Sequence, residues 1–144
     1  MKTRAIAILL ILPLVNIMVA AALTAAWIPD GVEILPYPSR YAEEPVSVSD
    51  SSGGSIVVWI DDSYGNSDIY AQRIDSTGSM LWLPSGIAVC TAVRQQTTFS
   101  VVQDGSGGAI VAWDEYRSGS YEIYAQRIIA SGSFHWETDG VHVC

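Results

Sequence analysis

Positive charge is scarce in this sequence, which has seven lysine and arginine residues against fifteen aspartate and glutamate residues and a net charge of −8. A surface of that sign repels phosphate backbones and anionic lipid. The composition therefore argues against nucleic-acid and peripheral membrane partners. It is compatible with cation binding and with solubility outside the cell.

Recognised catalytic patterns are missing as well. The sequence has no G-x-S-x-G motif, no histidine placed by a motif against a serine and no cysteine in a positively charged setting. The paired carboxylates Glu43-Glu44 and Asp114-Glu115 are adjacent in sequence, and neighbours on a strand face opposite ways, which separates them as a general acid and base. We therefore expect a non-enzymatic protein without catalytic residues or a resident cofactor.

The N-terminus has the order of an export signal. Two basic residues precede an uncharged run from Ala5 to Ile28 that ends in clustered alanines. We expect residues 1–26 to be a signal peptide cleaved after Ala22 or Ala26, and the protein to be secreted, periplasmic or at the cell surface. The run is also long enough for a retained membrane anchor. Cleavage after Ala26 leaves five basic residues against fifteen acidic ones, a net charge of −10.

An internal repeat organises the rest of the chain. The segment Asp50–Cys90 recurs 54 residues later as Asp104–Cys144 without insertion or deletion. The copies agree at about half of their positions, mostly glycine, tryptophan, aliphatic and turn residues. A partial third copy, Trp27–Leu35, matches the end of each full copy, Trp82–Cys90 and Trp136–Cys144.

Each copy divides into four short segments separated by turn signals, which is typical of β structure. The second segment has a continuous apolar run that ends in tryptophan, which indicates a strand buried on both faces. A glycine within the fourth segment is expected to bend the strand. The segments are Pro45–Ser49, Ser55–Trp59, Asp68–Ile74 and Trp82–Val89 in the first copy, and Thr98–Gln103, Ala109–Trp113, Glu122–Ile128 and Trp136–Val143 in the second.

A unit of about 50 residues with four antiparallel strands favours one blade of a β-propeller, whose inner strands are covered on both sides by neighbouring blades. We predict an all-β fold in which Trp27–Leu35 is a strand completing a blade, residues 36–90 form one blade and residues 91–144 a second. Closed propellers have about four to eight blades. The chain is therefore expected to be a fragment of a longer repeat protein, with self-assembly or an open pair of blades as alternatives.

The repeated pattern also carries a family resemblance. D-x-x-G-G-x-I-V-x-W, followed by [DE]-I-Y-A-Q-R-I and G-S-x-x-W, resembles repeats of large exported bacterial proteins thought to form propellers. The stretch IYAQRIDSTGSMLW is similar to part of the quinoprotein-type propeller repeat. The resemblance implies the blade architecture. It transfers no cofactor or calcium ligand of those enzymes to a position in this sequence.

The two cysteines, Cys90 and Cys144, occupy the same position in the two copies. Equivalent positions of adjacent units usually lie too far apart for a disulfide. Leu35 stands at this position in the partial copy, which indicates that the site requires a modest apolar side chain. We expect both cysteines to be buried free thiols.

Residues that recur in both copies are best explained by packing, which every copy shares. Among the polar ones, Arg73 and Arg127 are expected to pair with the carboxylates two residues after the first tryptophan, Asp61 and Glu115, because a buried arginine requires such a partner. The other recurring residues assigned to packing are Trp59 and Trp113, Tyr70 and Tyr124, Gln72 and Gln126, and Trp82 and Trp136.

Specific function is expected where the copies differ. The first copy has three carboxylates around a glycine turn, Asp61, Asp62 and Asp68, which makes a weak calcium candidate that lacks EF-hand spacing. The second copy alone has His135, Glu137 and His142, a set that zinc uses. The favoured interpretation of the first set is an ordinary acidic hairpin loop. The favoured interpretation of the second set is a group of solvated side chains on an edge strand.

The leading functional hypothesis is an exported, non-enzymatic propeller-type repeat module for binding or structural display, with a protein or glycan as ligand. The alternative is a piece of a larger propeller enzyme, for instance one acting on glycans, whose catalytic residues lie outside this chain. A third hypothesis is a membrane-tethered module. Closure of the ring is expected to require self-assembly or additional blades.

Overall fold

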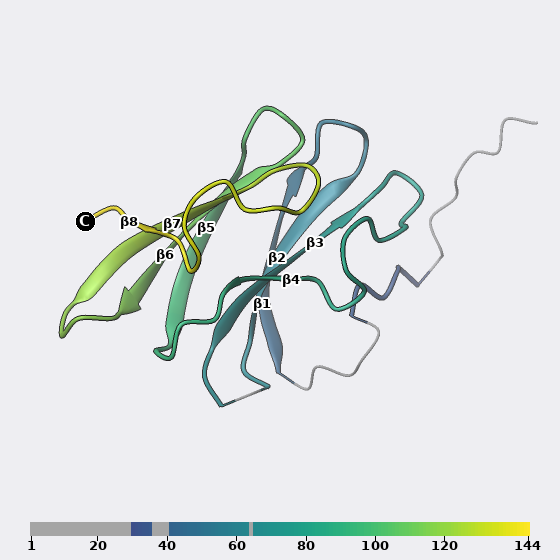
Figure 1. Cartoon of the computed structure of the whole chain (residues 1–144). Coiled ribbons are helices and arrows are strands. Elements are labelled where there is room, and N and C mark those ends of the chain that lie inside the picture. The colour runs from purple at the N-terminus through teal and green to yellow at the C-terminus, as the bar shows by residue number, and fades with distance from the viewer. Residues whose placement is uncertain (1–29, 36–40, 64) are drawn as a thin grey trace, which may run out of the picture.

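The computed structural model describes residues 30–35, 41–63 and 65–144, and its strands form two four-stranded antiparallel sheets (Figure 1). The first sheet has the order β1-β2-β3-β4 and the second β5-β6-β7-β8. The strands are β1 (Ala42–Ser49), β2 (Ser55–Asp61), β3 (Asp68–Ile74), β4 (Ile87–Cys90), β5 (Gln96–Gln103), β6 (Ala109–Tyr116), β7 (Tyr121–Ile128) and β8 (Val141–His142). Across the described ranges, no helix is long and apolar enough to cross a membrane.

Each copy of the repeat thus makes one sheet, and the predictions of an all-β fold and of four strands in a copy are confirmed. Neither described sheet closes on itself, and two sheets alone do not make a propeller. The propeller interpretation stays a prediction. The expected signal peptide, residues 1–26, lies outside the described residues.

The D-x-x-G-G signature makes the turn between the first two strands of each sheet. Asp50 Oδ1 accepts hydrogen bonds from the backbone N–H groups of Ser52 at 2.8 Å and Gly54 at 2.7 Å. A Cβ at Gly54 would lie 2.1 Å from the carbonyl oxygen of Ile74, so no larger residue fits there. The aspartate and the second glycine are therefore both required by the turn, and the second copy repeats the same contacts.

The fourth segment is shorter than predicted. Strand β4 begins only at Ile87, and Trp82 lies in the loop before it. Buried Gln72 fixes this loop, because its amide donates to the Leu83 carbonyl oxygen at 2.6 Å and its side-chain oxygen accepts from the Trp82 N–H at 3.1 Å. Gly86, with φ +78°, makes a turn rather than a bend in a strand. The second copy has the same arrangement.

The N-terminal residues 30–35 contain no strand. Ile34 and Leu35 border a cavity of about 200 Å³ together with Val57 and Trp59 of the first sheet. Trp27 lies outside the described residues. A strand that completes a blade therefore stays a prediction for this segment, but its apolar end lies against the first sheet.

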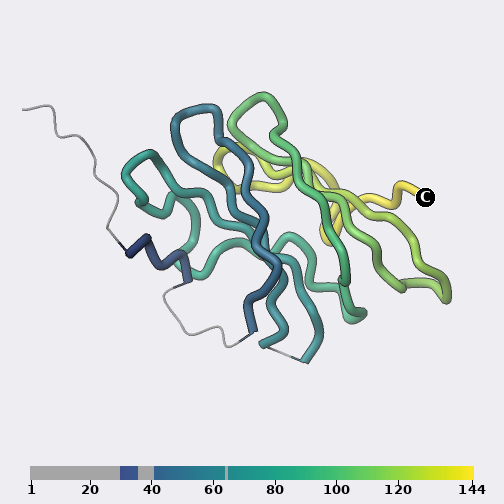
Figure 2. The backbone as a smooth tube through the Cα atoms, turned by 180° about the vertical axis from the view of Figure 1, so that it is seen from behind, coloured from purple at the N-terminus to yellow at the C-terminus, as the bar shows by residue number. Residues whose placement is uncertain are grey.

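The two sheets lie side by side, and Figures 1 and 2 show their equivalent turns next to each other. The buried core spans both sheets and includes Ile56, Val58 and Ile69 from the first sheet with Val111 and Trp113 from the second. Polar contacts also join the sheets. The Ala130 carbonyl oxygen accepts from Arg73 Nη1 at 2.8 Å and from Trp82 Nε1 at 3.2 Å.

Candidate functional site

The recurring arginines bind the turn aspartates, so the predicted pairing with Asp61 and Glu115 is wrong. Arg73 donates to Asp50 Oδ2 from Nε at 3.0 Å and from Nη2 at 2.8 Å, and Arg127 binds Asp104 in the same way. The strand register explains the difference. Arg73 lies opposite Ile56, next to the β1–β2 turn, whereas Asp61 lies at the far end of β2.

The turn aspartates are held in their charged form. Burial by itself would raise the pKa of Asp50, but two backbone N–H donors and the Arg73 guanidinium outweigh it and leave that pKa below its usual value. The pKa of Asp104 is lowered by the same balance. These ion pairs are structural, as expected for residues that both copies share.

Glu115 has a different partner. It is fully buried and accepts from Arg117 Nε at 3.0 Å, from Arg117 Nη2 at 2.6 Å and from Trp113 Nε1 at 3.2 Å. The Arg117 guanidinium also lies 3.8 Å from the centre of the Tyr124 ring. Hydrogen bonding to Glu115 raises the pKa of Arg117. The first copy has Ser63 in place of Arg117, so this arginine-centred cluster belongs to the second copy alone.

The cysteines are free, but only Cys90 is buried. Burial raises the pKa of the Cys90 thiol to about 12, with a further contribution from the nearby Glu115 carboxylate. Cys144 is exposed, so the prediction that both thiols are buried is wrong for this residue. The cause is packing, because Cys90 is covered by the second sheet and no described residue covers Cys144 in the same way.

The calcium and zinc candidates do not come together into metal sites. In the part of the chain that the structure describes, no group of three or more His, Cys, Asp or Glu side chains is arranged to hold a metal ion. Burial and the neighbouring carboxylates, Asp61 first among them, raise the pKa of Asp68, which disfavours its charged form. In the second copy His142 Nε2 lies 3.8 Å from Glu122 Oε2, and His135 is exposed.

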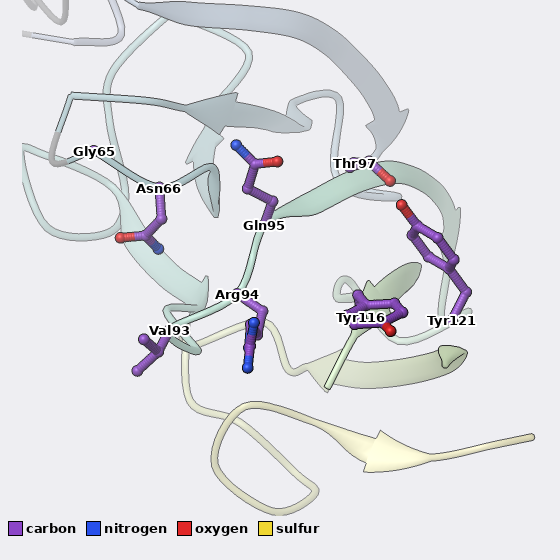
Figure 3. Close-up of a pocket in the computed structure, with 8 residues that line it drawn as sticks. All are labelled: Gly65, Asn66, Val93, Arg94, Gln95, Thr97, Tyr116 and Tyr121. Carbon is purple, nitrogen blue, oxygen red and sulfur yellow. The ribbon is translucent and has the colours of Figure 1, made fainter. Parts of the chain in front are cut away.

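A cleft of about 390 Å³ lies at the end of the two sheets that carries the β2–β3 and β6–β7 loops, along the connection between the sheets (Figure 3). Figure 3 shows two tyrosines at one end of the cleft, Asn66 and Val93 toward the other, and Arg94 between them. The lining residues are Gly65, Asn66, Val93, Arg94, Gln95, Thr97, Tyr116 and Tyr121.

Buried Gln96 fixes the chain segment at residues 93–95, which lines this cleft. Its side-chain amide donates to the carbonyl oxygens of Ala92 and Arg94, and its backbone N–H donates to the Ser67 carbonyl oxygen at 3.2 Å. Asn66 Nδ2 also donates to the Ala92 carbonyl oxygen at 3.4 Å. The connection between the sheets is thereby tied to the β2–β3 loop, and Arg94 is left exposed.

The aromatic pair gives the cleft its chemical character. The rings of Tyr116 and Tyr121 meet edge to face, with centroids 5.3 Å apart, and the side chains are 41% and 68% exposed. Exposed tyrosines offer an apolar face and a hydroxyl group to a ligand. Gln95, Thr97 and Arg94 add hydrogen-bonding groups, and Arg94 makes no ion pair with a described residue. The arrangement suits a polar ligand with a flat apolar face.

Specific function is expected where the copies differ, and the two tyrosines of the cleft are such a difference. Tyr116 stands where the first copy has Asp62, and Tyr121 where it has Ser67. The contribution of residues 93–95 was missed, because no repeat signal marks the connection between the sheets. Comparison of the chain with protein-family models, with curated proteins and with solved structures gave no match.

Proposed function

We propose that this chain is an exported, non-enzymatic repeat module of the β-propeller type that binds a saccharide in the cleft between its sheets. The observation that carries the proposal is the exposed edge-to-face pair of Tyr116 and Tyr121 beside side-chain amide and hydroxyl groups. Sugar rings combine hydroxyl groups with an apolar C–H face. The tyrosine ring can pack against the C–H face, and the tyrosine hydroxyl group can form hydrogen bonds with the sugar hydroxyl groups. Arg94 favours saccharides that carry a carboxylate.

The recurring side chains support a scaffold role for the rest of the molecule. Gln72 closes a loop, Asp50 closes a turn, and Arg73 joins the turn to the second sheet. These side chains are occupied by internal contacts, whereas the two tyrosines and Arg94 of the cleft are exposed. The sheets then act as a rigid support for the loops and strand ends that line the cleft.

A panel of neutral and uronic-acid-containing oligosaccharides, measured by isothermal titration calorimetry, tests the proposal. Tyr121→Ala is expected to weaken binding about tenfold or more, because an aromatic contact contributes about 1 kcal/mol beyond the area that it buries. Tyr41→Ala is the matched control, since Tyr41 is 58% exposed and does not line the cleft.

Three results would contradict the proposal. They are a panel without a ligand, an equal effect of the two tyrosine substitutions, and cleavage of a bound saccharide by this chain alone. A calcium chelator is expected to leave binding unchanged, because the described residues hold no carboxylate cluster suited to a metal ion.

A further inference from the structure

The contact between the two sheets joins two different faces of the repeat. Residues opposite each other in neighbouring strands project to the same face. The forward face of a sheet carries Ile56, Val58, Ile69 and Ala71 in the first copy, and the rear face carries Val57, Trp59 and Tyr70. The core cluster combines the forward face of the first sheet with the rear face of the second, where Val111, Trp113 and Tyr124 lie.

The forward face of the second sheet is uncovered in the described part of the chain. Ile69 is fully buried, but its equivalent Ile123 is 37% exposed. Val89 is 1% exposed and its equivalent Val143 is 58% exposed. Each of these two positions has the same amino acid in both copies. The difference in exposure therefore comes from the neighbouring sheet and not from the sequence.

We propose that this forward face binds the rear face of the first sheet in a second copy of the chain, so that copies associate head to tail. The internal contact supplies the template, because it joins a forward face to a rear face of the same repeat. Figures 1 and 2 both place the C-terminal residues at one end of the stack and residues 30–35, beside the rear face of the first sheet, at the other. A contact between unlike faces produces rings or filaments.

The internal contact between the sheets also predicts polar contacts between two copies of the chain. Within the chain, Arg73 and Trp82 donate to the Ala130 carbonyl oxygen. Their equivalents Arg127 and Trp136 then donate to the Ser76 carbonyl oxygen of the second copy, which is the position equivalent to Ala130. Arg127 makes its ion pair with Asp104, and its side chain is 30% exposed, against 13% for Arg73.

The N-terminal segment competes for the same place. Leu35 has the repeat position of Cys90 and Cys144, and it borders a cavity with Val57 and Trp59 on the rear face of the first sheet. Docking of Val143 and Cys144 on that face displaces Ile34 and Leu35 of the second copy. Association between copies is therefore weaker than the internal contact, and it strengthens when the apolar end of the segment is removed.

Cross-linking at one pair of thiols tests this geometry. Cys90 Sγ lies 3.9 Å from Glu115 Oε2, so Cys144 of one copy is expected beside Asp61 of the next. The chain as recovered from expressing cells, carrying Asp61→Cys, is expected to give a ladder of multimers with a short bis-maleimide. Ser52→Cys, at the opposite end of the first sheet, and the double variant Asp61→Cys with Cys144→Ser are expected to give none.

Substitutions on the two faces complete the test. Val143→Asp is expected to reduce the ladder about tenfold or more, because docking would bury an unpaired carboxylate. Val93→Asp is the control, since Val93 is 91% exposed and belongs to neither face. Leu35→Asp is expected to increase the ladder several-fold, because it weakens the competing segment.

Two outcomes overturn the proposal. One is a chain that retains its native fluorescence but gives no ladder through Cys144 and position 61. The other is an equal effect of Val143→Asp and Val93→Asp. The inference rests on the propeller-type stacking proposed above, and the saccharide titration separates the two failures: a monomer that binds saccharide refutes the association and leaves the binding function in place.

Discussion

Replacing Arg73 with methionine tests how the turn and the two sheets are held together. The arginine makes two hydrogen bonds to buried Asp50 and a third to the Ala130 carbonyl oxygen of the other sheet. Methionine keeps most of the apolar stem, so the change removes charge and hydrogen bonds more than packing. Asp50 would then be a buried carboxylate without its cation.

The expected loss in free energy of unfolding is about 3 kcal/mol. Breaking a buried ion pair from one side costs about 3–5 kcal/mol. The lower end applies here because Asp50 keeps two backbone N–H donors and Ala130 keeps the Trp82 donor. Arg127→Met is the matched control. Arg127 binds Asp104 in the same way, but it is more exposed and makes no contact across a described sheet interface, so a loss of about 1–2 kcal/mol is expected.

Equilibrium urea unfolding followed by tryptophan fluorescence measures both losses. The double variant Arg73→Met with Asp50→Asn is expected to recover part of the loss, because the asparagine side-chain oxygen still accepts the two backbone N–H groups and no charge is left buried. Equal losses for the two arginine substitutions would show that the bond to Ala130 adds nothing. Strict additivity in the double variant would show that the ion pair carries no coupling energy.

Three further predictions concern single residues. The pKa of Asp50 is lower in the folded than in the unfolded chain. The Asp50 carboxylate therefore contributes fully to stability above about pH 4, and this contribution is lost as the pH falls through the folded pKa. The midpoint of urea unfolding should drop over that pH range, and it should drop less steeply in Asp50→Asn. At pH 8 a maleimide should modify Cys144 in the native chain and should modify Cys90 only after unfolding, because burial raises the pKa of Cys90 to about 12. Equal reaction rates of the two cysteines in the folded chain would contradict this. Gly132→Ala should destabilise the chain more than Gly119→Ala in urea unfolding. Both glycines have positive φ, but a Cβ at Gly132 would lie 2.8 Å from the Trp82 indole of the other copy, whereas a Cβ at Gly119 would meet nothing within 4 Å. Equal losses of stability would show that the contact with Trp82 has no effect.

The strand segments could be predicted because their signals are local. The run from Ile56 to Trp59 is apolar throughout, and in the structure Val58 and Trp59, which face opposite ways, are both buried. The paired glycines after Asp50 mark a turn that accepts no larger residue at Gly54. Such features depend on the chain's own backbone over a few residues and are visible without knowledge of the fold.

The partner of Arg73 could not be predicted in the same way. The choice between Asp50 and Asp61 depends on the β2–β3 register, which places Arg73 opposite Ile56 at one end of the strand pair. Asp50 recurs as Asp104, exactly as Arg73 recurs as Arg127, and this shared recurrence is the signal that the sequence offered. Glu115 recurs only as a shorter carboxylate and has its own partner in Arg117.

The cleft was less accessible to sequence reasoning, because its walls come from three segments that are separate in the sequence. Tyr116 and Tyr121 belong to the second copy, Asn66 to the first, and Arg94 to the connection between them. The difference between Asp62 and Tyr116 marks one wall. Only the packing of one sheet on the other brings that wall opposite Asn66.

Val89 and Val143 show that a repeat does not separate structural from functional residues. The two valines have the same identity and the same place in their copies, yet one is buried by the second sheet and the other is 58% exposed. A residue assigned to packing in the first copy is therefore part of an uncovered apolar surface in the second. Recurrence establishes which contact a position can make, and the neighbouring sheet determines whether the chain makes it internally. Val143 is therefore a candidate for binding another sheet, because its equivalent in the first copy, Val89, already packs against one.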